Sequence, residues 1–529
     1  MLFVVLAPAV VAALVFAGTL WNGLVYDDPL ALARAAAPPA TLIFRRFGLT
    51  YLTIHAEQLV WQGWAPGLHL GNVALHAAAS SLVALLAVRL GARPWVACAT
   101  GLLFAVHPVH VEAVASIENR KEILAMIFVA ASVLLYLAPR AWTTIAALAA
   151  WALAMHAKEV AAVGLVLVLP LADVLIRRLS PALAVRRLIP IAAVGAVATA
   201  LYGGNVLAQL APDAVSKATS GAATSLGDSL LVTSASLPSV VRLLVFPSTL
   251  SADYPPPRPG GLLDPRVLAG LALAATALAA IVIAARRAPL AAFAVAWMVA
   301  MYLPLANVVP LGPHFIAERY LYVPSFGACL LVALGLDAIR RRTPGGALAL
   351  LAVLTISGAL RSMARVPEWR DSLSLWESAL RAVPDGSGNI HSELGLALSA
   401  AGRKEEAIEQ MRRSLASGPE KADTLSNLGT ELMNLGRNVE AIPYFVRALE
   451  IWPTNPVFHY NLGSAYLRAG YLDDALRELR IAASDETWRS ADPAFGAALA
   501  ARGLTEQQFR QTIEQWLAEN ASKIEARRR

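Results

Sequence analysis

Cysteine is scarce in this sequence, and its scarcity excludes two kinds of protein. Only two cysteines occur among 529 residues, Cys98 and Cys329, and both lie inside apolar segments far apart in the chain. A disulfide-stapled secreted domain and a zinc-thiolate site both need closely spaced cysteines. The sequence offers no such spacing, so neither class fits.

Charged residues are also few. They make up 15% of the chain, against 57% hydrophobic residues, and the mean hydropathy is +0.56. Soluble globular domains carry about 25% charged residues. The composition therefore predicts an integral membrane protein, and the length leaves room for at least one further domain.

The sequence also lacks the motifs of nucleotide and nucleic-acid binding. No Gly-rich phosphate loop is present. The net charge of +7 comes from short arginine clusters between apolar runs, a pattern typical of topology signals and not of a phosphate-binding surface. A soluble nucleotide sugar or a nucleic acid is therefore a poor fit as a ligand.

Apolar runs long enough, or nearly long enough, to cross a bilayer recur from the N-terminus to residue 362. We expect about eleven membrane-spanning helices, at residues 1–21, 70–88, 94–107, 122–138, 141–157, 159–176, 188–204, 266–285, 288–311, 320–338 and 345–362. The first run lacks a basic segment and a clear cleavage site, so we interpret it as a retained anchor. With the N-terminus in the cytoplasm, every inner turn carries arginine, namely Arg89/Arg93, Arg140, Arg177/Arg178 with Arg186/Arg187, Arg286/Arg287 and Arg340 to Arg342.

Residues 227–246 are the one ambiguous apolar segment. They contain Pro238 and Arg242, and a crossing here would place the later arginine clusters outside. We therefore predict that this segment lies along the outer surface as an amphipathic or re-entrant piece. The predicted external loops are then about 22–69, 107–121, 205–264 and 312–319.

Beyond residue 362 the sequence becomes charged, and a period of 34 residues appears. The recurring residues are Leu394/Leu428/Leu462, Gly395/Gly429/Gly463, Gly402/Gly436/Gly470 and Ala407/Ala441/Ala475. This is the tetratricopeptide period, with small residues where paired helices cross. We predict a linker and degenerate half-repeat at 363–387, three repeats at 388–487, and capping helices with a basic tail at 488–529.

The predicted fold is therefore all-α, with a polytopic membrane helix bundle at 1–362 followed by an α-solenoid. Solenoids of this kind present a concave face that suits a protein partner. They carry no chemistry of their own, so any reaction belongs to the membrane part. After eleven crossings the repeats emerge on the external side of the membrane, where the conspicuous polar residues of the membrane part are also expected.

Asp27 and Asp28 stand out among these external residues, because they follow directly on the first apolar helix. Acidic residues at a membrane rim are functional candidates. An Asp before Pro29 is also a common helix start, so capping alone is one interpretation of the pair. The other is that one of the two carboxylates accepts a proton from an attacking hydroxyl group.

The remaining external candidates are residues with imidazole, carboxylate or cationic side chains. They are His107, His110, Glu112, Arg120, Lys158, Glu159, Glu318 and Arg319. Three interpretations are open for the two His residues and Glu112: a metal site, contacts to a bound headgroup, and loop packing. We assign no metal ligand, because the spacing is not HExxH. Arg120, Lys158 and Arg319 are candidate phosphate contacts, since guanidinium and ammonium groups bind phosphate oxygens. Lys158 could equally form a structural ion pair.

These motifs occur in an order that resembles a known family. The first-loop Tyr-Asp-Asp, HPVHVEAVASIENRKE, AKEVAAVGLVLVLPLADVL, ERYLYVPSFGACLLVA and the C-terminal repeats are similar to the transmembrane and tetratricopeptide repeat-containing O-mannosyltransferases. That family belongs to the GT-C class of membrane glycosyltransferases. The resemblance covers residues 20–485, although three full repeats form a shorter array than in animal relatives, as in a bacterial-type member.

The resemblance implies an inverting transfer of a sugar, mannose or a similar one, from a polyprenyl-phosphate carrier to a hydroxyl group on a protein or glycan. It implies that Asp27 or Asp28 is the general base, that no cofactor is covalently bound, and that the reaction takes place on the non-cytoplasmic face. A divalent metal requirement stays open. We expect a location in a bacterial inner membrane, with the repeats periplasmic.

Three alternatives stay open at the level of sequence. The first is a non-catalytic, membrane-anchored repeat scaffold for envelope protein complexes. The second is a transporter, which would show charges near mid-span and inverted internal repeats, neither of which is clear here. The third is a related enzyme that adds sugar to a lipid or glycan while the repeats recruit partners.

Overall fold

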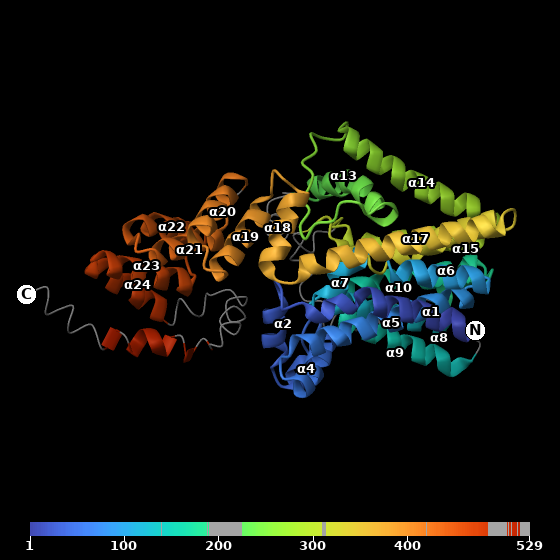
Figure 1. The fold of residues 1–529 in the computed structure, drawn as a ribbon, viewed down its shortest axis with the longest axis horizontal. Coiled ribbons are helices and arrows are strands. Elements are labelled where there is room, and N and C mark those ends of the chain that lie inside the picture. The colour runs from blue at the N-terminus through green and yellow to red at the C-terminus, as the bar shows by residue number, and fades with distance from the viewer. Residues whose placement is uncertain are drawn as a thin grey trace, which may run out of the picture. The chain divides into compact units, whose positions relative to one another are not determined.

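A computed structural model describes residues 1–138, 140–187, 189, 225–308, 314–418 and 420–484, and a few residues between 505 and 518. Every regular element in these ranges is a helix, which confirms the all-α prediction (Figure 1). The chain divides into two compact units. The membrane unit contains Met1–Asp28 and Ala35–Asp371, and the repeat unit contains Pro29–Arg34 and the chain from Ser372 onward.

Long apolar helices make up most of the membrane unit. They are α1 (Leu2–Phe16, extended by the 3-10 turn Ala17–Trp21), α5 (Ala65–Arg89), α6 (Pro94–Ala105), α8 (Arg120–Tyr136), α9 (Ala141–Ala157), α10 (Glu159–Leu175), α13 (Leu226–Val245), α14 (Pro265–Arg287), α15 (Pro289–Tyr302), α16 (Ser325–Arg340) and α17 (Pro344–Arg365). The shorter helices of this unit are α3 (Pro39–Leu42), α4 (Gly48–Trp61) and α7 (Val111–Ala115), whereas most of α2 (Asp28–Ala35) belongs to the repeat unit. The chain is an integral membrane protein built from these helices.

Most of the predicted spans coincide with these helices. Only the predicted span 188–204 lies almost wholly outside the described residues. By length and composition, five described helices could cross a membrane, or six if α6 and the bent segment after it are one span. Three further apolar helices are shorter. The number of eleven crossings therefore stays a prediction.

The helices of the membrane unit pack closely because small residues stand at their crossings. A Cβ added at Gly101 would come within 2.6 Å of the Pro8 ring, and one added at Gly327 within 2.3 Å of the Ala294 carbonyl oxygen. Such positions allow backbones to approach where a side chain would hold them apart. Helix α1 packs on α5 and α6, and it also contacts α17.

The ambiguous segment 227–246 forms α13, one continuous helix that contains Pro238. It packs on α14 so closely that a Cβ at Gly270 would meet the carbonyl oxygen of Ser234 at 1.8 Å. Helix α13 meets the length and composition criteria for a span. Its predicted position along the outer surface stays a prediction, and residues 205–224 of the predicted external loop lie outside the described residues.

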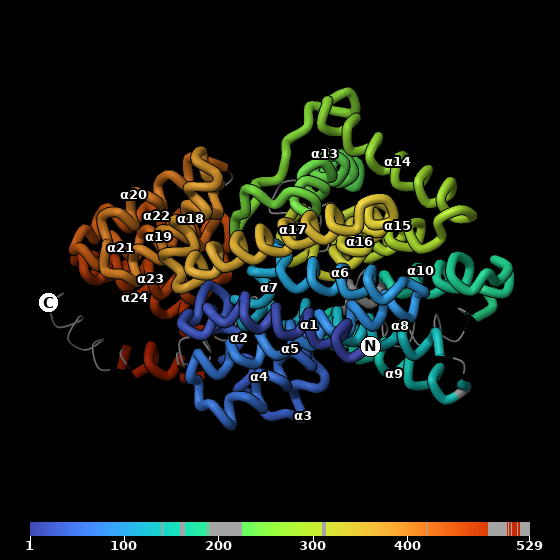
Figure 2. Tube along the Cα trace, turned by 45° about the vertical axis from the view of Figure 1, so that its right-hand side comes forward, coloured from blue at the N-terminus to red at the C-terminus, as the bar shows by residue number. Residues whose placement is uncertain are grey.

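The repeat unit follows the 34-residue period of the sequence (Figure 2). Helices α19 (Gly388–Ala400), α21 (Ala422–Asn434) and α23 (Pro456–Ala469) begin 34 residues apart. Each pairs with the next helix, namely α20 (Lys404–Ala416), α22 (Asn438–Ile451) and α24 (Leu472–Ala483), and α18 (Ser372–Ala382) precedes them as the half-repeat. The glycine between paired helices has a φ of 78° at Gly402 and 88° at Gly470, a conformation that favours glycine.

Candidate active site

Asp28 is completely buried at the start of α2, and backbone and side-chain donors surround its carboxylate. Oδ1 accepts hydrogen bonds from Ser116 Oγ at 3.0 Å and from the Glu118 backbone N–H at 2.9 Å, while Oδ2 accepts one from the Val25 N–H at 3.1 Å. Burial raises the pKa of Asp28 to about 7, although these hydrogen bonds oppose the rise. Asp28 thus joins the loop that follows α1 to the turn between α7 and α8.

Asp27 differs from its neighbour, because it is exposed. The preceding residue, Tyr26, has a φ of 50°, which is uncommon for a non-glycine residue. The structure therefore separates the two adjacent aspartates into a buried structural carboxylate and an exposed one.

Arg120 is buried and directed toward α4 and α5. Its Nε donates to Asn72 Oδ1 at 2.6 Å, and its Nη2 donates to Glu57 Oε2 at 2.7 Å and to the Leu68 carbonyl at 3.0 Å. The Glu57 carboxylate fits here because residue 71 is a glycine. A Cβ at Gly71 would lie 2.0 Å from Glu57 Oε1. The described partners of Arg120 are thus structural, and they give no support to its predicted contact with phosphate.

Arg120 also supports the turn that holds Asp28. Asn72, which receives the Arg120 Nε–H on its oxygen, donates through Nδ2 to the carbonyls of Val114 at 3.1 Å and Ser116 at 2.8 Å. A chain of contacts therefore runs from Glu57 through Arg120 and Asn72 to the turn at Ser116. Burial lowers the pKa of Arg120, while the charge of Glu57 raises it.

Three other cations form what we term the cation group: Lys121, Lys158 and Arg319. Lys121 pairs with Glu118 at 2.8 Å, Lys158 pairs with Glu122, and Arg319 pairs with Glu112. The Arg319 backbone N–H also donates to Glu112 Oε2, at 2.8 Å. All of these acids come from the short segment of α7 and α8. One segment therefore orients cations that are nearly 200 residues apart in sequence.

Tyr320 joins two members of the cation group. Lys158 Nζ lies 5.1 Å from the centre of its ring, and Arg319 Cζ lies 5.2 Å from it. Distances of this size allow a cation–π attraction. A single aromatic ring thus keeps an ammonium and a guanidinium group close together in spite of their like charges.

The surroundings of Lys158 and Arg319 shift the pKa values of these two cations in opposite directions. It lowers the pKa of Lys158, and the charges of Lys121 and Arg319 lower it further, while Glu122 opposes the change. Burial alone would lower the pKa of Arg319 too, but Glu112, Tyr320 and Tyr26 raise it above its ordinary value. Arg319 is therefore charged at any physiological pH.

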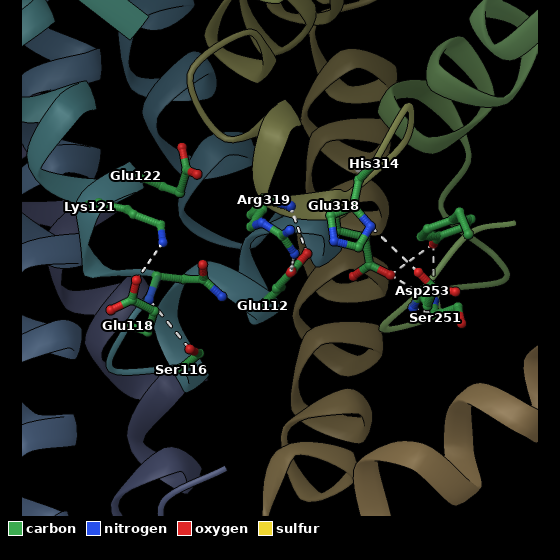
Figure 3. A network of polar contacts seen from close by, with 12 residues as sticks. Glu112, Ser116, Glu118, Lys121, Glu122, Ser251, Asp253, His314, Glu318 and Arg319 are labelled. Atoms are coloured by element: carbon green, nitrogen blue, oxygen red, sulfur yellow. Dashed lines mark hydrogen bonds and ion pairs between the residues drawn. The ribbon is translucent and has the colours of Figure 1, made fainter. Parts of the chain in front are cut away.

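Glu318 precedes Arg319 but belongs to a different network, which Figure 3 shows beside the Arg319–Glu112 pair. Its Oε1 accepts hydrogen bonds from the Ser251 N–H at 2.7 Å, Tyr254 Oη at 2.8 Å and Arg365 Nη2 at 2.9 Å. In the same network, His314 lies 3.5 Å from Asp253. Glu318 thus connects the loop after α13 to the end of α17, and its contacts are structural.

The two histidines of the HPVH segment are buried and point to different partners. His107 Nε2 lies 3.1 Å from the Leu244 carbonyl of α13, and His110 Nε2 lies 2.8 Å from Ser325 Oγ. No group of three His, Cys, Asp or Glu residues with metal-binding geometry is present in the described parts of the chain. The side chain of Glu159 lies outside the described residues. Loop packing is therefore the interpretation that the contacts of the two histidines favour.

Comparisons with known proteins agree with the sequence motifs. Two family models described as tetratricopeptide repeat match the C-terminal part, one at residues 368–422 and 392–456 and the other at residues 432–501. Protein O-mannosyl-transferase Tmtc3 of Drosophila melanogaster is 38% identical over 120 residues, which cover 21% of this chain and 12% of that protein. Protein O-mannosyl-transferase TMTC3 of Mus musculus is 27% identical over 476 residues, 79% of this chain and 51% of that protein.

Over these parts the chain is similar to protein O-mannosyl-transferases, and it carries tetratricopeptide repeats. Its matches span from about a tenth to about half of the length of these curated relatives. Among solved structures, ArnT from Cupriavidus metallidurans bound to undecaprenyl phosphate is 15% identical and covers 82% of this chain and 77% of that chain. Its TM-score is 0.34, which is too low to carry an argument.

Sequence reasoning missed two residues of this candidate site. Neither Lys121 nor Tyr320 was among the predicted site residues. Both stand directly beside a residue that was chosen, Arg120 in one case and Arg319 in the other. The signal that could have found Lys121 is the cluster of charge at the start of α8, where any of three neighbouring residues could face the site.

Proposed function

We propose that the chain is a membrane glycosyltransferase that moves a sugar from a polyprenyl-phosphate carrier to a hydroxyl group on a protein or glycan acceptor. The names of its relatives support protein O-mannosylation, and the absence of a nucleotide-binding loop in the sequence favours a lipid-linked donor. In the reaction, the acceptor oxygen bonds to the anomeric carbon as the bond from that carbon to the phosphate oxygen breaks. The acceptor proton passes to a carboxylate, and polyprenyl phosphate leaves.

Asp27 is the carboxylate that we assign as the general base. It is exposed, so an acceptor can reach it, whereas the oxygens of Asp28 are buried and already hold three hydrogen bonds. A general base must come within hydrogen-bond distance of the proton that it removes. The contrast in exposure between these two neighbouring aspartates is the observation that carries the assignment.

The cation group is the part of the site that we assign to the leaving phosphate. Its members are already paired with acids, so the group is close to neutral by itself. An ammonium has three N–H donors and a guanidinium has five, so donors are left over after each pair is made. Preorganised donors of this kind stabilise negative charge that develops during a reaction. We assign to Lys121 the phosphate contact that the sequence predicted for Arg120.

An inverting transfer sets a geometric condition on these parts. The acceptor oxygen and the departing phosphate must lie on opposite sides of the anomeric carbon, so the base and the cations must flank the sugar. The sugar is expected to bind between Asp27 and Arg319, with the acceptor on the side of Asp27.

The test compares sugar transfer by single variants in membranes supplied with labelled polyprenyl-phosphate mannose. Asp27→Asn should lower the transfer rate by about 100-fold or more, since general base catalysis typically contributes 10²–10⁴-fold. The matched control is Asp28→Asn, the same change one residue away. Its effect should come with a loss of thermal stability, which Asp27→Asn should not show.

Each outcome of this comparison is informative. Transfer that persists in Asp27→Asn but disappears in a stably folded Asp28→Asn protein would reverse the assignment of the base. If the native chain transfers label from no lipid donor, a non-catalytic scaffold becomes the better interpretation, because the tetratricopeptide repeats by themselves account for protein binding.

We also propose that the repeats lie on the external side of a bacterial inner membrane. Both native cysteines are buried, so a cysteine introduced on an exposed repeat residue reports on its own position. An Ala400→Cys variant should react with a membrane-impermeant maleimide in intact spheroplasts. Reaction only after lysis would place the repeats in the cytoplasm and contradict the proposed orientation.

A further inference from the structure

A second group of charges occupies the other ends of the helices that lead to the candidate active site. Helix α6 ends near His107 and begins after Arg93, while α16 begins near Arg319 and ends at Arg340. The two helices pack against each other. At a rise of about 1.5 Å per residue, α16 places its ends roughly 24 Å apart. This second group is therefore remote from Asp27 and the cation group.

Three arginines share one carboxylate there. Asp337 is buried, and its Oδ1 accepts from Arg340 Nε at 3.2 Å and Nη2 at 3.1 Å. Its Oδ2 lies 3.5 Å from Arg93 Nη1 and 3.4 Å from Arg341 Nη2. This differs from the cation group, where each cation has a carboxylate partner. We refer to Arg93, Arg340 and Arg341 as the arginine corner.

The arginine corner is accessible and carries excess positive charge. The side chains of Arg93, Arg340 and Arg341 are 59%, 36% and 64% exposed, whereas that of Asp337 is 5% exposed. Three cations against one anion leave two uncompensated positive charges. Arg340 also lies 5.7 Å from the centre of the Trp95 ring, and the buried Trp95 indole N–H has no hydrogen-bond partner in the described residues. Spare N–H donors therefore gather at this corner.

Exposed apolar side chains lie along the two helices that flank the corner. They include Val332 and Ile339 of α16 and Leu348 and Val353 of α17. In a membrane protein such residues contact acyl chains. A ligand that fits the corner and these neighbours has an anionic head and an apolar tail. A basic pocket between transmembrane helices is a known setting for anionic lipid headgroups.

We propose that the arginine corner binds the phosphodiester headgroup of an anionic phospholipid, in the leaflet opposite the candidate active site. Asp337 prearranges the guanidinium groups so that their outer N–H donors face the phosphate. The apolar side chains of α16 and α17 contact the acyl chains. The proposal does not rest on the proposed glycosyltransferase function, since none of its residues belongs to that site.

The test measures binding of phosphatidylglycerol to the full-length protein in detergent, by native mass spectrometry, with phosphatidylcholine as the zwitterionic comparison. Arg340→Ala/Arg341→Ala should weaken phosphatidylglycerol binding by roughly 30-fold, because each basic residue near an anionic headgroup contributes about a fivefold factor in affinity. Phosphatidylcholine binding should not change. The matched control is Arg286→Ala/Arg287→Ala, which removes the same charge at the end of α14.

Several results would overturn the proposal. Equal weakening in both double variants would show that diffuse positive charge, and not a site, attracts the lipid. Unchanged binding in Arg340→Ala/Arg341→Ala would exclude the corner. Inorganic phosphate that displaces phosphatidylglycerol at millimolar concentration would indicate a small-anion site. If the double variant fails to fold, Arg341→Gln alone, at the most exposed of the three positions, should still weaken binding about fivefold.

Discussion

Ion pairs in the membrane unit and in the repeat unit have similar distances but very different surroundings. The side chains of Arg365 and Glu318 are 2.9 Å apart and both fully buried. Arg403 and Glu406 in the repeat unit are 2.7 Å apart and largely exposed. A buried pair that loses one partner leaves an uncompensated charge, whereas water solvates the remaining member of an exposed pair. Distance alone therefore does not reveal which pairs hold the structure.

The largest effect is expected where a buried acid of the candidate site is neutralised. Glu112→Gln removes the charge that holds the Arg319 guanidinium and weakens the contact to its backbone N–H. Breaking a buried pair typically costs 3–5 kcal/mol, so the free energy of unfolding should fall by about 3 kcal/mol or more. Chemical unfolding of the full chain in detergent micelles measures this change.

A double variant sharpens the same measurement. Glu112→Gln/Arg319→Gln removes both charges, so no isolated cation is left in the site, and part of the lost stability should return. Sugar transfer should not return with it, because Arg319 is assigned to the leaving phosphate. If Glu112→Gln costs no more stability than Glu406→Gln in the repeat unit, the contrast between the two units is wrong.

Burial also predicts a pH dependence in the membrane unit. The pKa of Asp28 is raised from 3.8 to about 7, so the folded state binds its proton more tightly than the unfolded state. Its contribution to stability is therefore complete below about pH 4 and is lost as the pH rises through about 7. Glu118 adds to the rise, while Arg120 lies near enough to sense the charge of Asp28. Over this whole range the effect should amount to roughly 4 kcal/mol.

The measurement is the difference in stability between the native chain and Asp28→Asn at several pH values. Asparagine does not titrate, so the advantage of the native chain should shrink between pH 5 and pH 8. Subtracting the variant removes the contribution of other titrating groups. A difference that grows over this range would mean that Asp28 is charged in the folded protein and that its three hydrogen bonds outweigh its burial.

The repeat unit and the membrane unit also differ in how far apart in sequence their contacting residues lie. This difference explains why the repeats could be predicted residue by residue and the candidate site could not. The repeat contacts are local, so the 34-residue spacing of Gly395, Gly429 and Gly463 was enough to locate the paired helices. A Cβ at Gly429 would in fact meet the Phe445 ring at 2.7 Å. The prediction of an all-α fold with tetratricopeptide repeats is confirmed.

The site depends on contacts between distant parts of the chain. Asp27 and Asp28 are alike in the sequence, and what separates them is a turn at Ser116 that lies about 90 residues away. Arg120 and Lys121 are neighbours too, but successive residues of a helix point about 100° apart, so one faces Glu57 and the other the cation group. A sequence alone does not give the rotation of α8, and this is why Arg120 was chosen and Lys121 was not.

The smallest effect is expected in the repeat unit. Arg403 reaches Glu406 at 2.7 Å and Glu377 at 3.4 Å, but all three side chains are substantially exposed. Arg403→Ala should change the protection of α20 amides from hydrogen exchange by less than about fivefold, because exposed pairs contribute little. The full chain is used, and mass spectrometry reads the peptides of α20. The same experiment on Glu112→Gln gives the loss of amide protection around Arg319. If Arg403→Ala lowers the protection of α20 as strongly, solvated pairs also determine the geometry of the repeats. The difference between the two units would then depend on position and not on burial.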